Sequence, residues 1–121
     1  MKILYAEDDV MMQKIVVHSL VRLGYEVTTV DDGKEALESV ESEEFDLIIL
    51  DLFMPKMSGF EVVEIIRNEL HIDTPILILS RSHLDEAIQK AYTAGANDFI
   101  VKPFDPEELI VKITKILTSK R

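Results

Sequence analysis

Five short apolar runs alternate with longer amphipathic segments along the chain. Four of the runs, at residues 2–6, 45–50, 76–79 and 99–101, are almost continuously apolar, whereas residues 26–30 alternate between apolar and polar side chains. Continuous apolar runs of this length are typical of strands that are buried on both faces of a parallel sheet. We therefore predict five parallel strands, with residues 26–30 at an edge of the sheet.

Helix start signals lie between the predicted strands. Asp32, Ser58 and Asp105 each stand three residues before a Glu, which is the pattern of an N-cap residue and its capping-box partner. Pro106 follows Asp105 at the first helical position, where a missing N–H has no cost. These signals predict helices that begin shortly after each of the three residues.

The spacing of apolar residues in these segments predicts which face of each helix packs on the sheet. A weaker pattern predicts a further helix over residues 84–94, which ends before Gly95. The residues expected to face the core are Val10, Met11, Ile15, Leu20 and Val21 in the first helix, Ala36, Leu37 and Val40 in the second, Phe60, Val63, Ile66 and Leu70 in the third, and Leu109, Ile113, Ile116 and Leu117 in the last.

The alternation of strand and helix indicates an α/β fold of the (βα)5 type. Short connections and right-handed crossovers favour an open, doubly wound parallel sheet with helices on both faces. Five strands are too few for a closed eight-stranded barrel. The length of 121 residues is that of one domain, so we expect a single domain over residues 1–121.

Composition limits the classes of partner. With 13 Lys and Arg against 23 Asp and Glu, the net charge of −10 argues against direct binding to nucleic acid or an anionic membrane. The chain has no cysteine, which excludes a disulfide framework and a thiolate metal site. It enters a predicted strand at once and has no apolar run near the roughly 18 residues of a membrane span. We expect a soluble, cytoplasmic protein.

Polar side chains with useful chemistry follow four of the five predicted strands. Glu7 and Asp8 follow the first strand, Asp51 the third, Ser80 the fourth and Lys102 the fifth. Because the carboxyl ends of parallel strands lie along one edge of a sheet, these side chains are expected to converge. Three close carboxylates repel one another, and Mg²⁺, which prefers carboxylate and water oxygens, relieves that repulsion. The chain has no glycine-rich phosphate loop, so we expect no nucleotide site.

This combination of groups suits transfer of a phosphoryl group. A carboxylate can act as a nucleophile and form an acyl phosphate, and Asp51 is the candidate. Glu7 and Asp8 would place Mg²⁺ against the phosphoryl oxygens. Lys102 would pair first with Asp51 and then with the phosphoryl group, to which Ser80 could donate its hydroxyl.

Each of these residues also has a structural explanation when taken alone. Asp8 or Asp9 would cap a helix, because acids favour helix N-termini. Ser80 would be a turn residue, Lys102 a solvated charge, and Phe99 part of the core. The site prediction therefore depends on the convergence of the strand ends.

Four segments, ILYAEDD, IILDLFMPKMSG, ILILS and FIVKPF, occur in an order and spacing that resemble the receiver domain of two-component response regulators. The resemblance covers the whole chain. It implies a flavodoxin-like sheet with strand order 2-1-3-4-5. It also implies phosphorylation of Asp51, with Mg²⁺ held by Glu7, Asp8, Asp51 and the backbone carbonyl of Phe53.

The same resemblance implies how such a domain signals. Ser80 and Phe99 correspond to switch residues that couple phosphorylation to the surface formed by the fourth helix, the last strand and the fifth helix. The Lys102–Pro103 bond matches a peptide bond that is usually cis. The implied partners are a sensor histidine kinase or phosphotransfer protein, a downstream target or effector domain, and a second copy after phosphorylation. Asp51 takes part in its own phosphorylation and dephosphorylation, so no enzyme with a separate substrate is expected.

Two residues depart from the pattern of that family. Arg81 is large and charged where the family has a small residue, so it either shields Asp51 from a phosphodonor or recognises a partner. Phe53 is apolar where a polar side chain is usual, which predicts slow self-dephosphorylation. Two alternatives stay open: a phosphorylation-independent binding module with the same fold, and the receiver part of a longer regulator with an effector domain.

Overall fold

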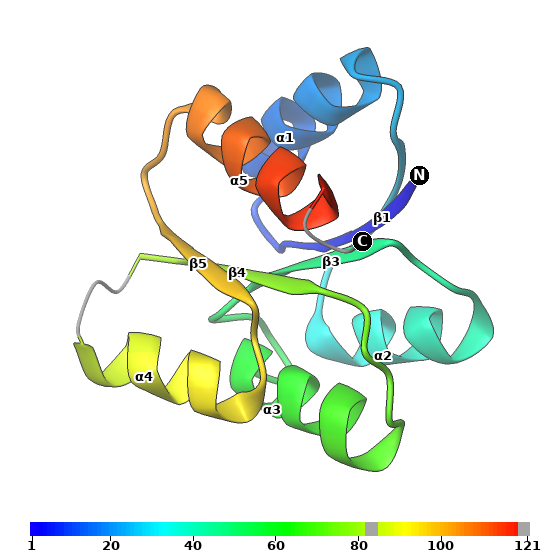
Figure 1. Cartoon of the computed structure of the whole chain (residues 1–121), viewed down its shortest axis with the longest axis vertical. Helices are drawn as coiled ribbons and strands as arrows, with labels where there is room; N and C mark the ends of the chain where they lie inside the picture. The colour runs from blue at the N-terminus through cyan, green and yellow to red at the C-terminus, as the bar shows by residue number, and fades with distance from the viewer. Residues whose placement is uncertain (82–84, 119–121) are drawn as a thin grey trace.

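The computed structural model describes residues 1–81 and 85–118, in which strands and helices alternate as predicted (Figure 1). The strands are β1 (Lys2–Ala6), β2 (Glu26–Val30), β3 (Leu47–Asp51), β4 (Ile76–Ser80) and β5 (Asp98–Val101). The helices are α1 (Val10–Arg22), α2 (Gly33–Ser42), α3 (Gly59–Glu64), α4 (Asp85–Ala94) and α5 (Pro106–Thr118), with a π-helical turn, η1 (Ile65–Glu69), after α3. Leu84, the expected start of the fourth helix, lies outside the described residues.

The five strands form one parallel sheet in the order β2-β1-β3-β4-β5, as predicted. Helices α1 and α5 cover one face, and α2, α3 and α4 cover the other (Figure 1). Strand β2 lies at the edge, and its residues are partly or fully exposed, whereas every residue of β3 and β4 is buried. The doubly wound α/β prediction is confirmed.

Alternate residues of the inner strands enter two separate core layers. Ile3 and Tyr5 of β1 pack in the layer under α1 and α5, whereas Leu4 and Ala6 pack in the layer under α2, α3 and α4. This division follows from the two-residue repeat of a strand. It explains why the inner strands are continuously apolar in the sequence.

The predicted packing face of α1 is wrong. Of the five expected core residues, only Leu20 is buried, and Val10, Met11, Ile15 and Val21 are 47–67% exposed. The buried residues are Val16 and Leu20, with Met12 and Val17 packed beside them. Apolar side chains surround most of this helix, so periodicity alone does not identify the face that meets the sheet.

The third predicted helix is continuous in sequence but changes its winding. α3 ends at Glu64, and the chain continues as the π-helical turn η1, closed by the Leu70 N–H that donates to the Ile65 carbonyl at 2.9 Å. Val63 and Ile66 are buried as expected, Val62 is buried in addition, and Phe60 and Leu70 are partly buried. Ile66 and Leu70 still pack on the core despite the wider turn.

The predicted caps fix where the helices start. Asp32 accepts a hydrogen bond from the Glu35 N–H at the start of α2, Ser58 forms a capping box at α3, and Asp105 accepts from the Glu107 N–H at α5. Gly59 brings α3 against the end of β3, since a Cβ at this residue would lie 2.8 Å from the Asp51 carbonyl oxygen. The loop after Asp51 is thereby held close to the sheet.

Candidate functional site

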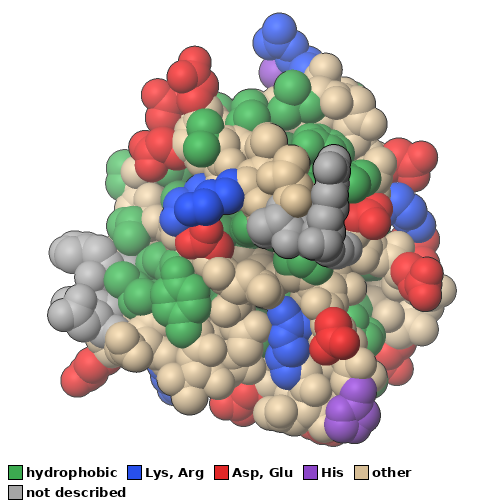
Figure 2. Space-filling model, viewed as in Figure 1, with side chains coloured by type: hydrophobic (Ala, Val, Ile, Leu, Met, Phe, Trp, Pro, Cys, Tyr) green, Lys and Arg blue, Asp and Glu red, His purple; other side chains and the backbone are tan. Residues whose placement is uncertain are grey.

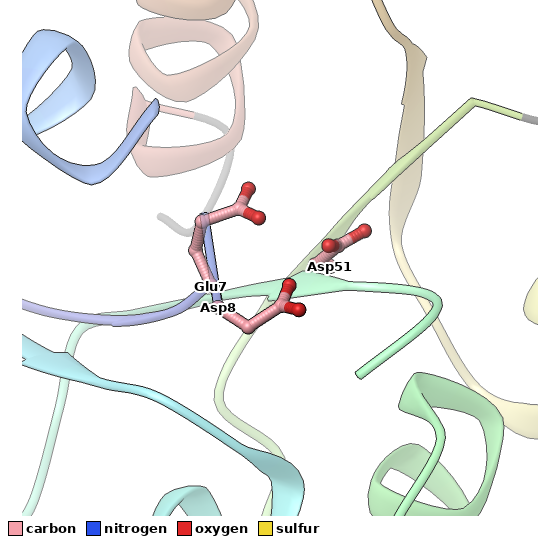
Figure 3. Close-up of side chains that lie close together, drawn as sticks. All are labelled: Glu7, Asp8 and Asp51. Atoms are coloured by element: carbon pink, nitrogen blue, oxygen red, sulfur yellow. The ribbon is translucent and has the colours of Figure 1, made fainter. Parts of the chain in front are cut away.

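The predicted carboxylates meet at the carboxyl edge of the sheet. Glu7 and Asp8 follow β1, Asp51 ends the adjacent strand β3, and one ligand oxygen from each lies within 4.8 Å of the others. Figure 3 shows the three side chains gathered at this edge. Glu7 and Asp51 are buried and Asp8 is exposed, so the cluster opens toward solvent on the side of Asp8.

Lys102 reaches the cluster from the end of β5. Its Nζ lies 2.7 Å from Glu7 Oε1 and 3.4 Å from Asp51 Oδ2. The pairing of Lys102 with Asp51 was expected, but the shorter contact with Glu7 was not. Lys102 is only 8% exposed, so one buried ammonium forms ion pairs with two buried carboxylates.

The Glu7 carboxylate accepts two further hydrogen bonds. The Tyr5 hydroxyl donates to Oε1 at 3.2 Å, and the Asp9 N–H donates to Oε2 at 3.3 Å. Burial, reinforced by the Glu7 carboxylate, raises the pKa of the Tyr5 phenol, which therefore stays protonated and remains a donor. The sequence pattern did not identify Tyr5 as a site residue, because it lies inside an apolar run.

Asp9 has the capping role that the sequence allowed. Its carboxylate accepts hydrogen bonds from the N–H groups of Met11 and Met12 at the start of α1. Asp9 therefore orients the helix that follows the acidic pair, and it leaves Asp8 free to face the cavity described below.

The negative charge of Asp51 is only partly compensated by its surroundings. Burial and the nearby Glu7 carboxylate raise the pKa of Asp51 to about 7, and the Lys102 ammonium opposes this rise only in part. A divalent cation beside Asp51 would favour its ionised form. The site thus has an excess of buried negative charge that a cation would relieve.

A cavity of about 390 Å³ gives access to Asp51. Both residues that depart from the receiver pattern lie at this cavity, since Arg81 and Phe53 line it and are exposed. The complete lining is Glu7, Asp8, Asp9, Asp51, Phe53 and Arg81.

The two expected switch residues lie on the last two strands of the sheet, β4 and β5. Ser80 is fully buried at the end of β4, and its carbonyl accepts a hydrogen bond from the Lys102 N–H at 2.7 Å. Phe99 of β5 is 7% exposed and packs in the layer under α2, α3 and α4. This burial fits both core packing and switching. The Lys102–Pro103 peptide bond is cis, as expected.

Residues 3–114 match the family model of the response regulator receiver domain. The chain belongs to this family. One relative, the transcriptional regulatory protein CrdR of Helicobacter pylori, is 36% identical over 118 residues, which cover 98% of this chain and 55% of CrdR. The chain spans about half the length of the curated relatives it matches.

Solved receiver structures share the flavodoxin-like fold. The chemotaxis response regulator CheY4 of Vibrio cholerae has a TM-score of 0.90 and 39% identity, over 96% of this chain and 98% of that chain. The receiver domain of the sensor histidine kinase PA1611 from Pseudomonas aeruginosa has a TM-score of 0.87 and 31% identity, over 97% of each chain. The PA1611 structure has a magnesium ion coordinated in its active site cleft.

The donor set of this receiver domain fits Mg²⁺. Three carboxylates supply hard oxygen ligands, two of them buried, and the exposed Asp8 leaves room for the water molecules that Mg²⁺ retains. Within residues 1–81 and 85–118, no helix is long and apolar enough to cross a membrane.

Proposed function

We propose that this receiver domain is a phosphorylation-dependent signalling switch in which Asp51 accepts a phosphoryl group from a histidine of a sensor kinase or phosphotransfer protein. The observation that carries the proposal is the meeting of Glu7, Asp8 and Asp51 within 4.8 Å, with Lys102 3.4 Å from Asp51. Four charged groups from the ends of β1, β3 and β5 meet at one place, which supports this function over a passive binding module.

In the proposed reaction, an Asp51 carboxylate oxygen attacks the phosphorus of the donor. A P–O bond forms, the P–N bond to the donor histidine breaks, and its electron pair returns to the imidazole nitrogen. Lys102 lies close enough to Asp51 to neutralise negative charge that develops on the transferred group. No substrate other than the phosphodonor is turned over, so we do not regard the domain as a separate enzyme.

Glu7, Asp8 and Asp51, with the Phe53 backbone carbonyl, would hold Mg²⁺ in this site. When bound, the ion supplies positive charge against the phosphoryl oxygens. The Asp51 pKa of about 7 leaves part of the protein with a protonated, non-nucleophilic Asp51 near neutral pH when no cation is present. Glu7 and Lys102 keep this carboxyl group oriented toward the cavity.

We propose that the signal leaves the site through Ser80 and Phe99. Phosphorylation adds roughly −1.5 to −2 charges and new acceptor oxygens, toward which Ser80 and Lys102 would move. Ser80 lies two residues after Ile78, on the same face of β4, and Ile78 pairs with Phe99 of β5. A movement of Ser80 would therefore change the space next to Phe99. To change the ratio of active to inactive conformation from about 1:99 to 99:1, phosphorylation must favour the active one by about 5.5 kcal/mol. Several such contacts must therefore form together.

The proposed output surface comprises α4, β5 and α5. Tyr92 and Val111 expose apolar area on this part of the molecule, and apolar side chains gather near these elements in Figure 2. A target protein, an effector domain or a second phosphorylated copy could bind there. We infer a cytoplasmic location from the proposed kinase and target partners.

Labelling with a small phosphodonor tests this function. Wild-type protein incubated with acetyl phosphate and Mg²⁺ should gain one phosphoryl group in intact-mass measurements, and EDTA or Asp51→Asn should abolish the gain. Asp46→Asn, at the opposite end of β3, is the control and should leave labelling unchanged. Persistent labelling of Asp51→Asn would show that another residue is the nucleophile.

A further inference from the structure

Tyr5 is a fully buried phenol whose hydroxyl contacts the acidic cluster. It lies in β1, two residues before Glu7 and therefore on the same face of the strand. Its hydroxyl donates to Glu7 Oε1 at 3.2 Å, and the same oxygen accepts the Lys102 ammonium at 2.7 Å. The other oxygen, Oε2, accepts the Asp9 N–H at 3.3 Å.

The ring of Tyr5 does not by itself require a tyrosine. It packs in the apolar layer under α1 and α5, where a phenylalanine ring would fill the same space. The hydroxyl is tolerated in that layer because it has a hydrogen-bond partner, and that partner is Glu7. The hydroxyl is what distinguishes tyrosine from phenylalanine here, and it acts on the Glu7 carboxylate.

Counting acceptor positions shows what this hydrogen bond does. An ionised carboxylate has about four lone-pair sites, two on each oxygen. Tyr5 and Lys102 occupy both sites on Oε1, and the Asp9 N–H occupies one on Oε2. Oε2 therefore receives fewer of these donors than Oε1 and keeps more capacity for a cation, and the side chain cannot rotate without breaking bonds to Oε1.

We propose that Tyr5 is a positioning residue of the metal site, which fixes the Glu7 carboxylate through its hydroxyl so that one oxygen remains available to Mg²⁺. This inference rests on the proposed function, since it concerns the same ion. Lys102 does not fix Glu7 alone, because its ammonium is shared with Asp51 and contacts only one of the two Glu7 oxygens. Groups that hydrogen-bond a metal ligand typically change metal affinity about 10- to 100-fold when they are removed.

Tyr5→Phe tests the inference, because it removes only the hydroxyl. The dissociation constant of Mg²⁺ should rise about tenfold or more, measured by isothermal titration calorimetry and, with Mn²⁺ as a probe, by electron paramagnetic resonance. Tyr92→Phe is the matched control. The Tyr92 hydroxyl also donates to a carboxylate, that of Asp98 at 3.4 Å on β5, and its loss should leave metal affinity unchanged.

A double-mutant cycle separates positioning from packing. Glu7→Asp keeps a carboxylate but shortens it by one methylene, so the Tyr5 hydroxyl no longer reaches it. Tyr5→Phe should weaken metal binding in the wild-type background and have no further effect in the Glu7→Asp background. Equal loss in both backgrounds, or an unchanged dissociation constant in Tyr5→Phe, would overturn the inference. Failure of the wild-type protein itself to bind Mg²⁺ would instead contradict the proposed function.

Discussion

Lys102 is shared between two buried carboxylates, and the way it is shared sets the chemistry of Asp51. The ammonium lies closer to Glu7 than to Asp51, at 2.7 Å against 3.4 Å. Lys102 therefore offsets only part of the free-energy cost of burying the charged Asp51 carboxylate, and the pKa of Asp51 rises to about 7. A nucleophile held in this way becomes fully ionised when positive charge arrives beside it.

This arrangement predicts how stability depends on pH in the metal-free protein. The pKa of Asp51 is about 7 in the folded state and near 4 in the unfolded chain. Between these values the folded protein binds one more proton than the unfolded chain, so the free energy of unfolding falls as pH rises from about 4 to 7. Asp51→Asn should remove this contribution.

Urea unfolding in EDTA at pH 5 and pH 8 measures the effect. The loss of stability between the two pH values should be smaller in Asp51→Asn than in the wild-type protein. Comparing the two proteins cancels the titration of the histidines, which both contain. An identical loss in both would mean that the pKa of Asp51 is not raised.

At this scale, the sequence predicted which residues converge but not how they bond to one another. Glu7, Asp51 and Lys102 were identifiable because each stands at the end of an apolar run. The Tyr5 hydroxyl and the preference of Lys102 for Glu7 depend on strand register and on side-chain rotamers. Apolar and polar patterns carry no information on either.

At the scale of elements, Arg67 joins three segments that the sequence treats separately. From η1 its guanidinium donates to the carbonyls of Gly95 at 3.0 Å and Ile72 at 2.7 Å, and to Asn97 Oδ1 at 2.8 Å. η1 is thereby tied to the chain that enters β4 and to the connection between α4 and β5. This network ties η1 to the segment between α4 and β5, two of the elements of the proposed output surface.

Arg67→Met should lower the free energy of unfolding by about 2–3 kcal/mol, because charge-assisted hydrogen bonds are lost and partly buried carbonyls lose their donors. Chemical denaturation at constant pH measures this change. Arg22→Met, at an exposed position on α1, should change stability by less than about 0.5 kcal/mol. Similar values for the two variants would mean that the Arg67 contacts contribute little to stability.

Sequence prediction at this scale succeeded where a local signal decides the outcome. Caps at Asp32, Ser58 and Asp105 marked the helix starts, because each satisfies backbone N–H groups within its own segment. It failed for α1, where apolar side chains lie on several sides and tertiary packing selects Val16 and Leu20. It also missed η1, because no residue pattern marked the change to π-helical winding.

For the whole molecule, the order of elements alone determined most of the architecture. Alternating strands and helices with right-handed crossovers leave few arrangements, and the observed sheet is the predicted one. This topology brings Glu7 and Lys102, 95 positions apart in the chain, into direct contact. On the face shown in Figure 2, acidic and basic side chains are interspersed, so the net charge of −10 does not by itself locate a partner. The output surface and its target depend on other molecules, which no pattern within this chain specifies.

The central claim is that Asp51 forms an acyl phosphate, and chemical mapping of the modified residue tests it most directly. Borohydride reduces an aspartyl phosphate to homoserine, which peptide mass spectrometry locates. Protein treated with acetyl phosphate and Mg²⁺ should yield homoserine at position 51, and protein treated in EDTA should not. Phosphorylated protein that yields the product at another residue, or none at position 51, would contradict the account.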